Sequence, residues 1–173
     1  MADAVDAGKV RAVGVSNYSA EQMRQAHAVL AERGVPLASN QVEYSLLHRQ
    51  PESNGVLDAC RELGITLIAY QPLAGGALTG KYGAGQRPRG LRRFMMPYFR
   101  NDDAVAPVVA LLREIGARYD KTPAQVALRW LMENECVLPI PGAKNGRQAA
   151  ANAGALAFHL TPDEVAALSR ASA

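Results

Sequence analysis

The sequence has little that would tie the protein to a membrane, a metal ion or a disulfide framework. Its only two cysteines, Cys60 and Cys136, match no metal-ligand spacing, and such sparse use favours a reducing, cytoplasmic setting. No run approaches the roughly 18 consecutive apolar residues of a membrane helix. The first ten residues, MADAVDAGKV, lack the apolar core of a secretory signal. We therefore expect neither a membrane span nor a signal peptide.

The excess of positive over negative charge is also small, because the formal net charge is only +3. Positive charge clusters once, in residues 86–100, where five arginines stand among Phe94, Tyr98 and Phe99. Such a segment can bind RNA or an acidic membrane surface. A surface loop over an anionic ligand is the interpretation we favour, so a nucleic-acid partner is not expected.

What is present is an ordinary globular composition, with 49% hydrophobic and 20% charged residues. The length of 173 residues suits a single domain over residues 1–173. A chain of this size buries about two thirds of its unfolded surface, enough for a sizeable core.

The first half of the chain alternates short apolar runs with helical patterns. Val13, Asn40 and Leu67 mark the strand centres and recur every 27 residues, a step typical of repeated βα units. The last of these strands is almost continuously apolar, which indicates burial on both faces. Strands are predicted over 11–16, 38–45 and 65–70, with helices from Ser19 to Gly34 and over 51–64.

The second half begins with residues 71–103, which are rich in glycine, proline and arginine and contain no convincing helix or strand. Helices are then predicted over 104–119 and 123–134, a fourth strand over 137–142, and helices over 144–156 and from Thr161 onward. This order predicts an α/β fold with a parallel sheet and helices outside it. Because a closed (β/α)8 barrel needs eight strands, four strands indicate half of such a barrel or a small open sheet.

Candidate binding residues follow the predicted strands, since ligands of parallel α/β folds bind at the carboxyl ends of the strands. Amides, hydroxyls and an aromatic ring gather there, and these groups suit a carboxamide and a flat heterocycle. Lys144 and Arg147 stand at the start of a helix, where phosphate binds well. Together these features describe a nicotinamide dinucleotide.

Four segments carry a resemblance to a known family. GKVRAVGVSNYS, NQVEYSLL, GITLIAYQPLAGGALTGKY and VLPIPGAKNGRQAAAN resemble the carboxyl-terminal half of the aldo-keto reductases. The resemblance spans about residues 7 to 170. It implies half of a TIM-type (β/α)8 barrel that binds NADP(H) without a Rossmann domain. It also implies the reduction of a small carbonyl substrate by hydride transfer, with a tyrosine as general acid.

The resemblance assigns cofactor contacts to thirteen residues. Ser16, Asn17 and Gln41 match the positions that hold the nicotinamide carboxamide, and Tyr70 matches the aromatic residue stacked on the ring. The remaining matches are Gln71, Leu73, Gly75 and Gly76 for the pyrophosphate loop, Ile140, Gly142 and Lys144 beside the adenosine 2′-phosphate, and Gln148 and Asn152 at the adenosine.

The sequence departs from the family pattern in three ways. Gln71 stands where many members have serine, and Gly142 where a lysine is common. Ala151 replaces a glutamate, which weakens adenine recognition, and the missing lysine at Gly142 leaves discrimination of the 2′-phosphate to Lys144 or Arg147.

No catalytic residue is expected in this chain, because the catalytic Asp, Tyr, Lys and His of the family all precede the matched region. His48 could replace the missing acid, but a solvated loop histidine is the simpler interpretation, and Glu43 is expected at the surface or facing a helix. Trp130 lies on an apolar helix stripe and is expected in the core.

Half a barrel leaves sheet edges and part of its inner face uncovered. Self-association is the solution we favour, and a partner chain or a truncated fragment are the alternatives. The two functions that remain open are an NADP(H)-dependent oxidoreductase of carbonyl compounds and a non-catalytic NADP(H)-binding or interaction protein.

Overall fold

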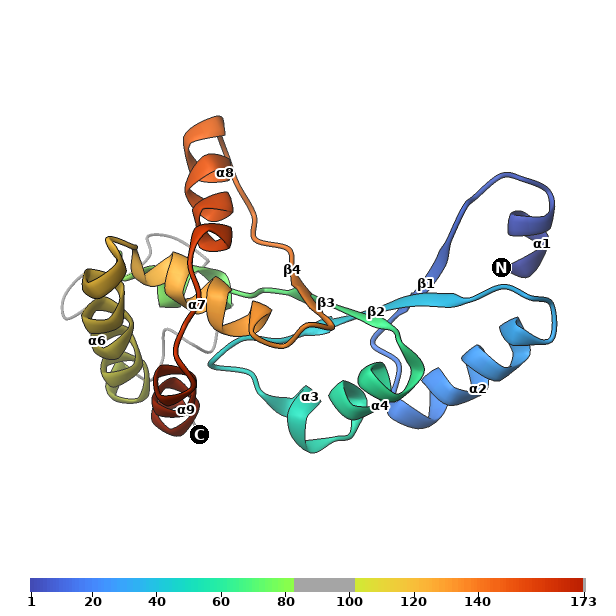
Figure 1. Cartoon of the computed structure of the whole chain (residues 1–173), viewed down its shortest axis with the longest axis horizontal. Coiled ribbons are helices and arrows are strands. Elements are labelled where there is room, and N and C mark those ends of the chain that lie inside the picture. Colours follow the sequence, from blue (N-terminus) through green and yellow to red (C-terminus); the bar gives the residue numbers. More distant parts are fainter. Residues whose placement is uncertain (83–101, 173) are drawn as a thin grey trace.

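Four parallel strands form the centre of the molecule, in the order β1-β2-β3-β4 (Figure 1). The computed structural model describes residues 1–82 and 102–172, so the arginine-rich segment 86–100 lies outside the described residues. The strands are β1 (Val13–Ser16), β2 (Leu37–Glu43), β3 (Thr66–Tyr70) and β4 (Val137–Pro139). The predicted strand number and parallel α/β class are confirmed.

Helices connect the strands and pack against the sheet. Three helices begin with a reciprocal capping box at Ser19, Thr122 and Thr161, at the starts that the sequence predicted. The α-helices are α1 (Ala2–Asp6), α2 (Ala20–Ala31), α3 (Gln50–Ser53), α4 (Val56–Leu63), α6 (Asp102–Tyr119), α7 (Pro123–Met132), α8 (Gly146–Ala153) and α9 (Pro162–Ala171). Two 3-10 helices, η1 (Ala74–Thr79) and η3 (Gly154–Ala157), complete the described elements.

Two of the helices expected from the sequence are each divided into two elements. The single helix expected over 51–64 is divided into α3 and α4, because Gly55 takes a left-handed conformation with φ of 80° between them. The stretch 71–103, in which no helix or strand of normal length was expected, contains the short 3-10 helix η1, and α6 begins at Asp102, just before the expected start at 104. In the same way, the helix expected over 144–156 is α8 followed by η3.

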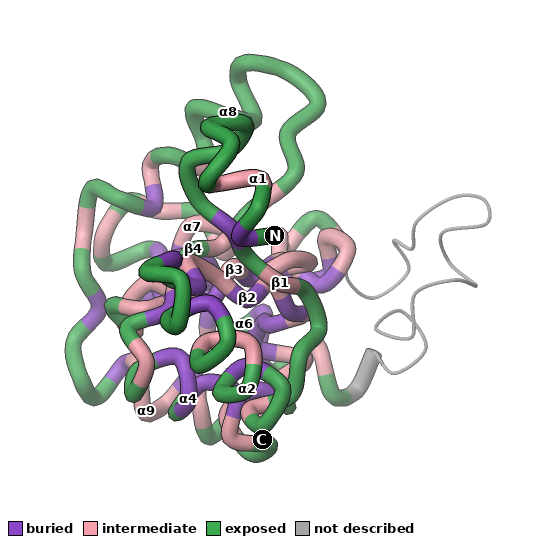
Figure 2. Tube along the Cα trace, turned by 90° about the vertical axis from the view of Figure 1, so that its right-hand side faces the viewer, coloured by how far each residue is buried: buried purple, intermediate pink, exposed green. Residues whose placement is uncertain are grey.

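The core lies on one side of the sheet. Alternate residues of β3, Leu67 and Ala69, are fully buried toward the helices, while the residues between them are only half-buried. The expectation that this strand is buried on both faces was therefore wrong. In Figure 1, α2, α3 and α4 lie below the strands, and the opposite side opens between α1 and α8. Figure 2 shows the buried positions gathered among the strands and their covering helices, with α8 exposed along its length.

The uncovered face of the sheet carries apolar residues as well as polar ones. Leu138 is 52% exposed and Ile140 is 43% exposed, at and just beyond β4. Within the described ranges, β1 and β4 each have a neighbouring strand on one side only. The sheet thus has the open edges expected of a partial barrel. None of the helices in the described ranges has the length and apolarity required to cross a bilayer.

Gly116, near the end of α6, is a position where a side chain does not fit. An added Cβ would come within 2.3 Å of the backbone oxygen of Lys121, which cannot rotate away. We expect Gly116→Ala to lower the free energy of unfolding by about 1–3 kcal/mol through this overlap. Gly146→Ala is the matched control, because its added Cβ meets nothing within 4 Å. Urea denaturation checks both, and equal stability of the two variants would contradict the packing described.

Glu164 ties α9 to α6 and makes stability depend on pH. Its carboxylate accepts hydrogen bonds from the Tyr119 hydroxyl at 2.7 Å and from the Thr161 backbone N–H at 2.9 Å, and it pairs with Arg118. Burial raises the pKa of this carboxyl, but the hydrogen bonds from Thr161 and Tyr119 outweigh it, and the net pKa is lowered.

A lowered folded-state pKa means that this stabilisation is present above the unfolded pKa of about 4.3 and is lost as the pH falls through the folded value. We therefore expect Glu164→Gln to cost about 1–2 kcal/mol at neutral pH, with the difference from wild type shrinking in acid. Urea unfolding at several pH values measures it. A difference that does not change with pH would contradict a charged Glu164.

Candidate functional site

The carboxyl ends of the first three strands bring four of the predicted site residues together. The Ser16 hydroxyl donates to the backbone oxygen of Gln41 at 3.0 Å, and the Tyr70 hydroxyl donates to Asn17 Oδ1 at 3.3 Å. Asn17 Nδ2 in turn donates to Ser16 Oγ at 3.3 Å. The side chains of Ser16, Asn17 and Tyr70 therefore form one polar cluster with the backbone oxygen of Gln41, although these residues are up to 54 positions apart in the sequence.

The backbone at the end of β1 explains how Asn17 reaches this cluster. Asn17 has a left-handed φ of 58°, a conformation that asparagine tolerates better than most residues with a side chain. Its backbone N–H donates to the oxygen of Gln41 at 2.9 Å, which extends the β1–β2 pairing by one residue. The turn thus lifts the Asn17 side chain out of the strand and toward Tyr70.

Asn40 supports this turn from below, a role that the sequence did not reveal. Its fully buried amide donates to the backbone oxygen of Tyr18 at 3.0 Å and accepts from the Tyr18 backbone N–H at 3.4 Å. Asn40 also contacts the sulfur of Met23. A polar residue in the middle of a buried strand was the available signal, because buried amides need partners.

A second group of predicted residues forms the turn after β3. Gln71 has a φ of 53°, and its Oε1 accepts from the backbone N–H of Gly75 at 3.0 Å. Gly76 donates its backbone N–H to the oxygen of Leu73 at 2.9 Å. Gly75 and Gly76 both have positive φ, at 64° and 102°, so glycine is needed for this tight path. The four residues Gln71, Leu73, Gly75 and Gly76 thus lie together in one tight turn.

The third group surrounds the start of α8. The backbone N–H of Ile140 donates to the oxygen of Ala69 at 3.0 Å, which places Ile140 beside Tyr70. Gln148 Oε1 accepts from the backbone N–H of Lys144 at 2.8 Å, and Asn152 Nδ2 donates to the oxygen of Gly142 at 3.4 Å. Two amide side chains of the helix therefore hold the preceding loop in place, which leaves the Lys144 side chain exposed.

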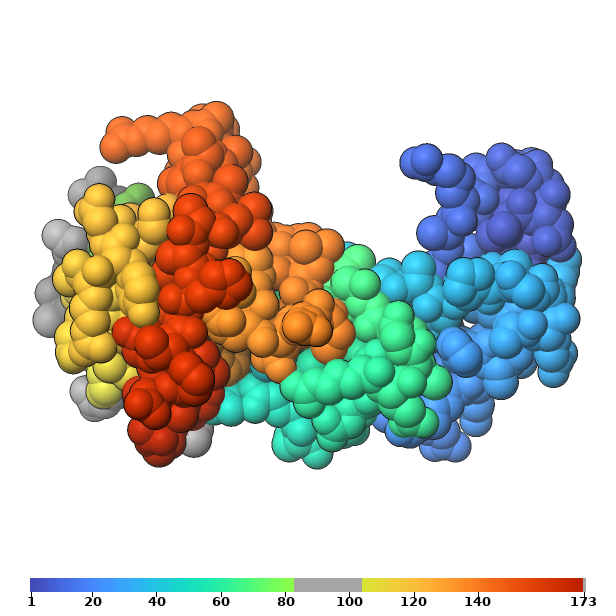
Figure 3. Space-filling model, in the orientation of Figure 1, coloured from blue at the N-terminus to red at the C-terminus, as the bar shows by residue number. Residues whose placement is uncertain are grey.

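The three groups follow neighbouring strands of one parallel sheet, so they share its carboxyl edge. Figure 3 shows the molecule hollowed between the N-terminal segment and α8, on the side of the sheet opposite α2 and α4. Tyr70 links the groups, since it contacts Asn17 on one side and directly precedes Gln71 on the other.

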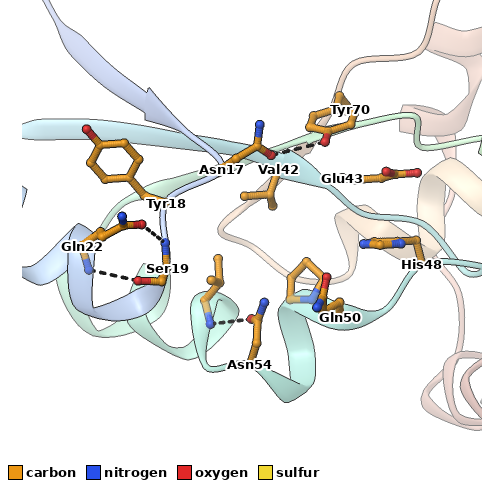
Figure 4. A pocket seen from close by; sticks show the side chains of 12 residues that line it. Asn17, Tyr18, Ser19, Gln22, Val42, Glu43, His48, Gln50, Asn54 and Tyr70 are labelled. Carbon is orange, nitrogen blue, oxygen red and sulfur yellow. Dashed lines mark hydrogen bonds between the residues drawn. The ribbon is translucent and has the colours of Figure 1, made fainter.

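A crevice of about 380 Å³ opens next to this cluster, between the start of α2 and α3 (Figure 4). Asn17 and Tyr70 lie at its edge, whereas Gln41 and Lys144 do not line it. Glu43 and His48 both lie along this crevice and are half-buried. Glu43 was expected at the surface or against a helix, and His48 in a solvated loop, so the structure gives both a more enclosed position.

Comparison with known proteins identifies the family of the chain. Residues 1–173 match the model of the aldo/keto reductase family. The chain is 44% identical to the chloroplastic pyridoxal reductase of Arabidopsis thaliana over 91% of its own length and 42% of that protein's. It is 39% identical to an aldo-keto reductase of Strobilurus tenacellus, over 97% of this chain and 50% of that protein.

Among solved structures, a thermostable aldo-keto reductase in complex with the inhibitor epalrestat superposes with a TM-score of 0.75 at 26% identity. The match covers 99% of this chain and 52% of that one. The chain therefore spans about half the length of the relatives it matches. With the whole sequence matched by the family model and its fold shared with family structures, the chain belongs to the aldo/keto reductase family.

Proposed function

We propose that this chain supplies the cofactor-binding half of an NADP(H)-dependent oxidoreductase of carbonyl compounds. The observation that carries the proposal is the polar cluster of Ser16, Asn17, Gln41 and Tyr70 at the carboxyl edge of the sheet. Relatives that are named reductases support the reaction class. We place the reaction in the cytoplasm, because the two cysteines are free and no disulfide framework is expected.

The residues present fit a nicotinamide dinucleotide. Ser16, Asn17 and Gln41 would hold the carboxamide, and the half-exposed ring of Tyr70 offers a flat face to the nicotinamide. The positive-φ turn at Gly75 and Gly76 lets a pyrophosphate approach the backbone closely. When bound, the cofactor supplies a hydride to a carbonyl carbon.

The adenosine end of the cofactor would lie against the third group. Ile140, Gly142 and Lys144 would border the 2′-phosphate, and Gln148 and Asn152 the adenosine. The exposed Lys144 and Arg147 supply positive charge at the start of α8, where the helix dipole also favours an anion. In this arrangement the two side chains would balance part of the phosphate charge.

The proton donor would come from outside residues 1–173. A non-catalytic protein that binds the same cofactor is the alternative. A truncated fragment would neither bind the cofactor nor reduce a carbonyl compound. Self-association or a partner chain would cover the exposed Leu138 and Ile140 and pair the open edges of the sheet. Analytical ultracentrifugation of the chain tests self-association, and a stable, well-folded monomer would exclude it.

Cofactor binding is tested by titrating NADPH and following its fluorescence. Stacking on Tyr70 predicts that Tyr70→Phe, which keeps the ring, retains most of the affinity, whereas Tyr70→Leu loses about tenfold, equivalent to about 1.4 kcal/mol. Equal affinity of the two variants would contradict the stacking role. Loss of NADPH absorbance on adding an aldehyde separates the enzyme from the binding protein, because only the enzyme consumes the cofactor.

A further inference from the structure

The crevice between α2 and α3 has polar groups that neither the fold nor the proposed cofactor site uses. Gln50 and His48 form hydrogen bonds with the rest of the described chain only through their backbone groups. Both side chains line the crevice (Figure 4). The Gln50 amide therefore has a donor and an acceptor free, and the His48 imidazole has two ring nitrogens free.

Two further side-chain amides of the lining form a structural hydrogen bond through their oxygen only. Gln22 Oε1 accepts from the backbone N–H of Ser19 at 2.9 Å, and Asn54 Oδ1 accepts from the backbone N–H of Val56 at 3.1 Å. In both residues the structural bond occupies the oxygen and leaves the NH₂ group free to donate. The two helix starts thus fix the amides in place, one on each side of the crevice, and this preorganisation reduces the entropy lost on binding.

The lining selects a ligand by its charge. Among the described residues that line the crevice, none is a lysine or an arginine. Phosphates and carboxylates are therefore disfavoured. A wholly apolar ligand is also disfavoured, because it would strip water from the free amides without replacing their hydrogen bonds.

The lining also contains apolar surface between the polar groups. Val42 and Pro51 contribute aliphatic carbon, and Tyr18 and Tyr70 contribute rings. A small neutral molecule that carries both C–H and O–H groups matches the apolar surface and the free amides of the lining. The volume of about 380 Å³ lies within the range of about 300–1,000 Å³ that is usual for small-molecule sites.

We propose that this crevice is a binding site for a small neutral polyhydroxylated ligand, held by the amides of Gln22, Gln50 and Asn54. The crevice adjoins the proposed cofactor cluster, because Asn17 and Tyr70 also line it, but none of the three amides belongs to the cofactor groups. A ligand of this size, with about a dozen non-hydrogen atoms, is expected to bind with a millimolar dissociation constant.

The test uses myo-inositol as the probe, because it is neutral and has no carbonyl group to reduce. Polyols stabilise most proteins by being excluded from their surfaces, so melting temperature is an unsuitable readout. Side-chain amide signals in ¹H–¹⁵N NMR spectra of the whole chain, recorded without any nucleotide, report binding directly. We expect saturable shifts at Gln22, Gln50 and Asn54, and none from inorganic phosphate or benzyl alcohol at these amides.

Two leucine variants of glutamine complete the test. Gln50→Leu should weaken myo-inositol binding about tenfold, while Gln25→Leu, an exposed glutamine on α2 outside the crevice lining, should leave it unchanged. The spectrum of each variant shows whether it is folded. The proposal is overturned if myo-inositol causes no saturable shift in the crevice, if phosphate saturates these amides instead, or if folded Gln50→Leu binds as well as wild type.

Discussion

Replacing Trp130 with alanine is expected to lower the free energy of unfolding by about 3–5 kcal/mol. The Trp130 side chain on α7 is only 2% exposed, and its ring lies 5.7 Å from that of Tyr44. Its indole N–H donates to Ser169 Oγ on α9 at 3.1 Å. The substitution would therefore leave a cavity where the segment after β2, α7 and α9 meet.

Arg49 makes this junction more sensitive to the loss. Its guanidinium lies 5.5 Å from the centre of the Trp130 ring and pairs with Glu52, which also accepts from the Tyr44 hydroxyl at 2.8 Å. Arg49 also donates to the backbone oxygen of Ser169. Without the indole, water would reach a half-buried ion pair whose geometry the ring now fixes.

Trp130→Phe is the matched control. It retains most of the apolar area and loses the hydrogen bond to Ser169, so we expect a smaller loss of about 1–2 kcal/mol. Urea or guanidinium unfolding measures both variants. If Trp130→Ala were within about 1 kcal/mol of wild type, the packing of α7 against α9 would not be as described.

Replacing Asn40 with alanine is expected to lower the free energy of unfolding by about 2–3 kcal/mol. The buried amide satisfies both backbone groups of Tyr18, and alanine would leave these groups without their partner. Because Tyr18 directly follows Asn17, the left-handed turn at Asn17 would lose its support. NADPH affinity should therefore fall together with stability, although Asn40 does not belong to the cofactor groups.

Asn134→Ala is the control for Asn40→Ala. Asn134 accepts one hydrogen bond from the exposed side chain of Arg61, so its loss should cost well under 1 kcal/mol and leave NADPH affinity unchanged. Denaturation and fluorescence titration of the two variants measure both effects. An Asn40→Ala protein that is as stable as wild type and binds NADPH normally would show that the turn needs no support.

The sequence predicted the architecture well because its signals were local and redundant. The capping boxes at Ser19, Thr122 and Thr161 and the regular strand spacing each fixed an element independently of the others. The thirteen candidate site residues came from a family resemblance, and the rule that ligands bind at strand carboxyl ends predicts that they share one edge of the sheet.

The features that we did not predict from the sequence depend on long-range contacts. Nothing local distinguishes Gly55 as a break between α3 and α4, since glycine also occurs inside helices. The half-exposure of Ile68 follows from an uncovered sheet face, which an apolar strand cannot reveal. The bond between Asn40 and Tyr18 joins residues 22 positions apart and becomes visible only once β2 lies beside the β1 turn.

The most direct test of the central claim is a crystal structure of the chain grown with NADPH. We expect the nicotinamide ring to lie against Tyr70, its carboxamide within hydrogen-bond distance of Asn17 or Gln41, and its phosphates near Gly75 and Lys144. NADPH bound elsewhere on the surface, with Tyr70 and Asn17 keeping their mutual hydrogen bond and touching no nucleotide, would contradict it.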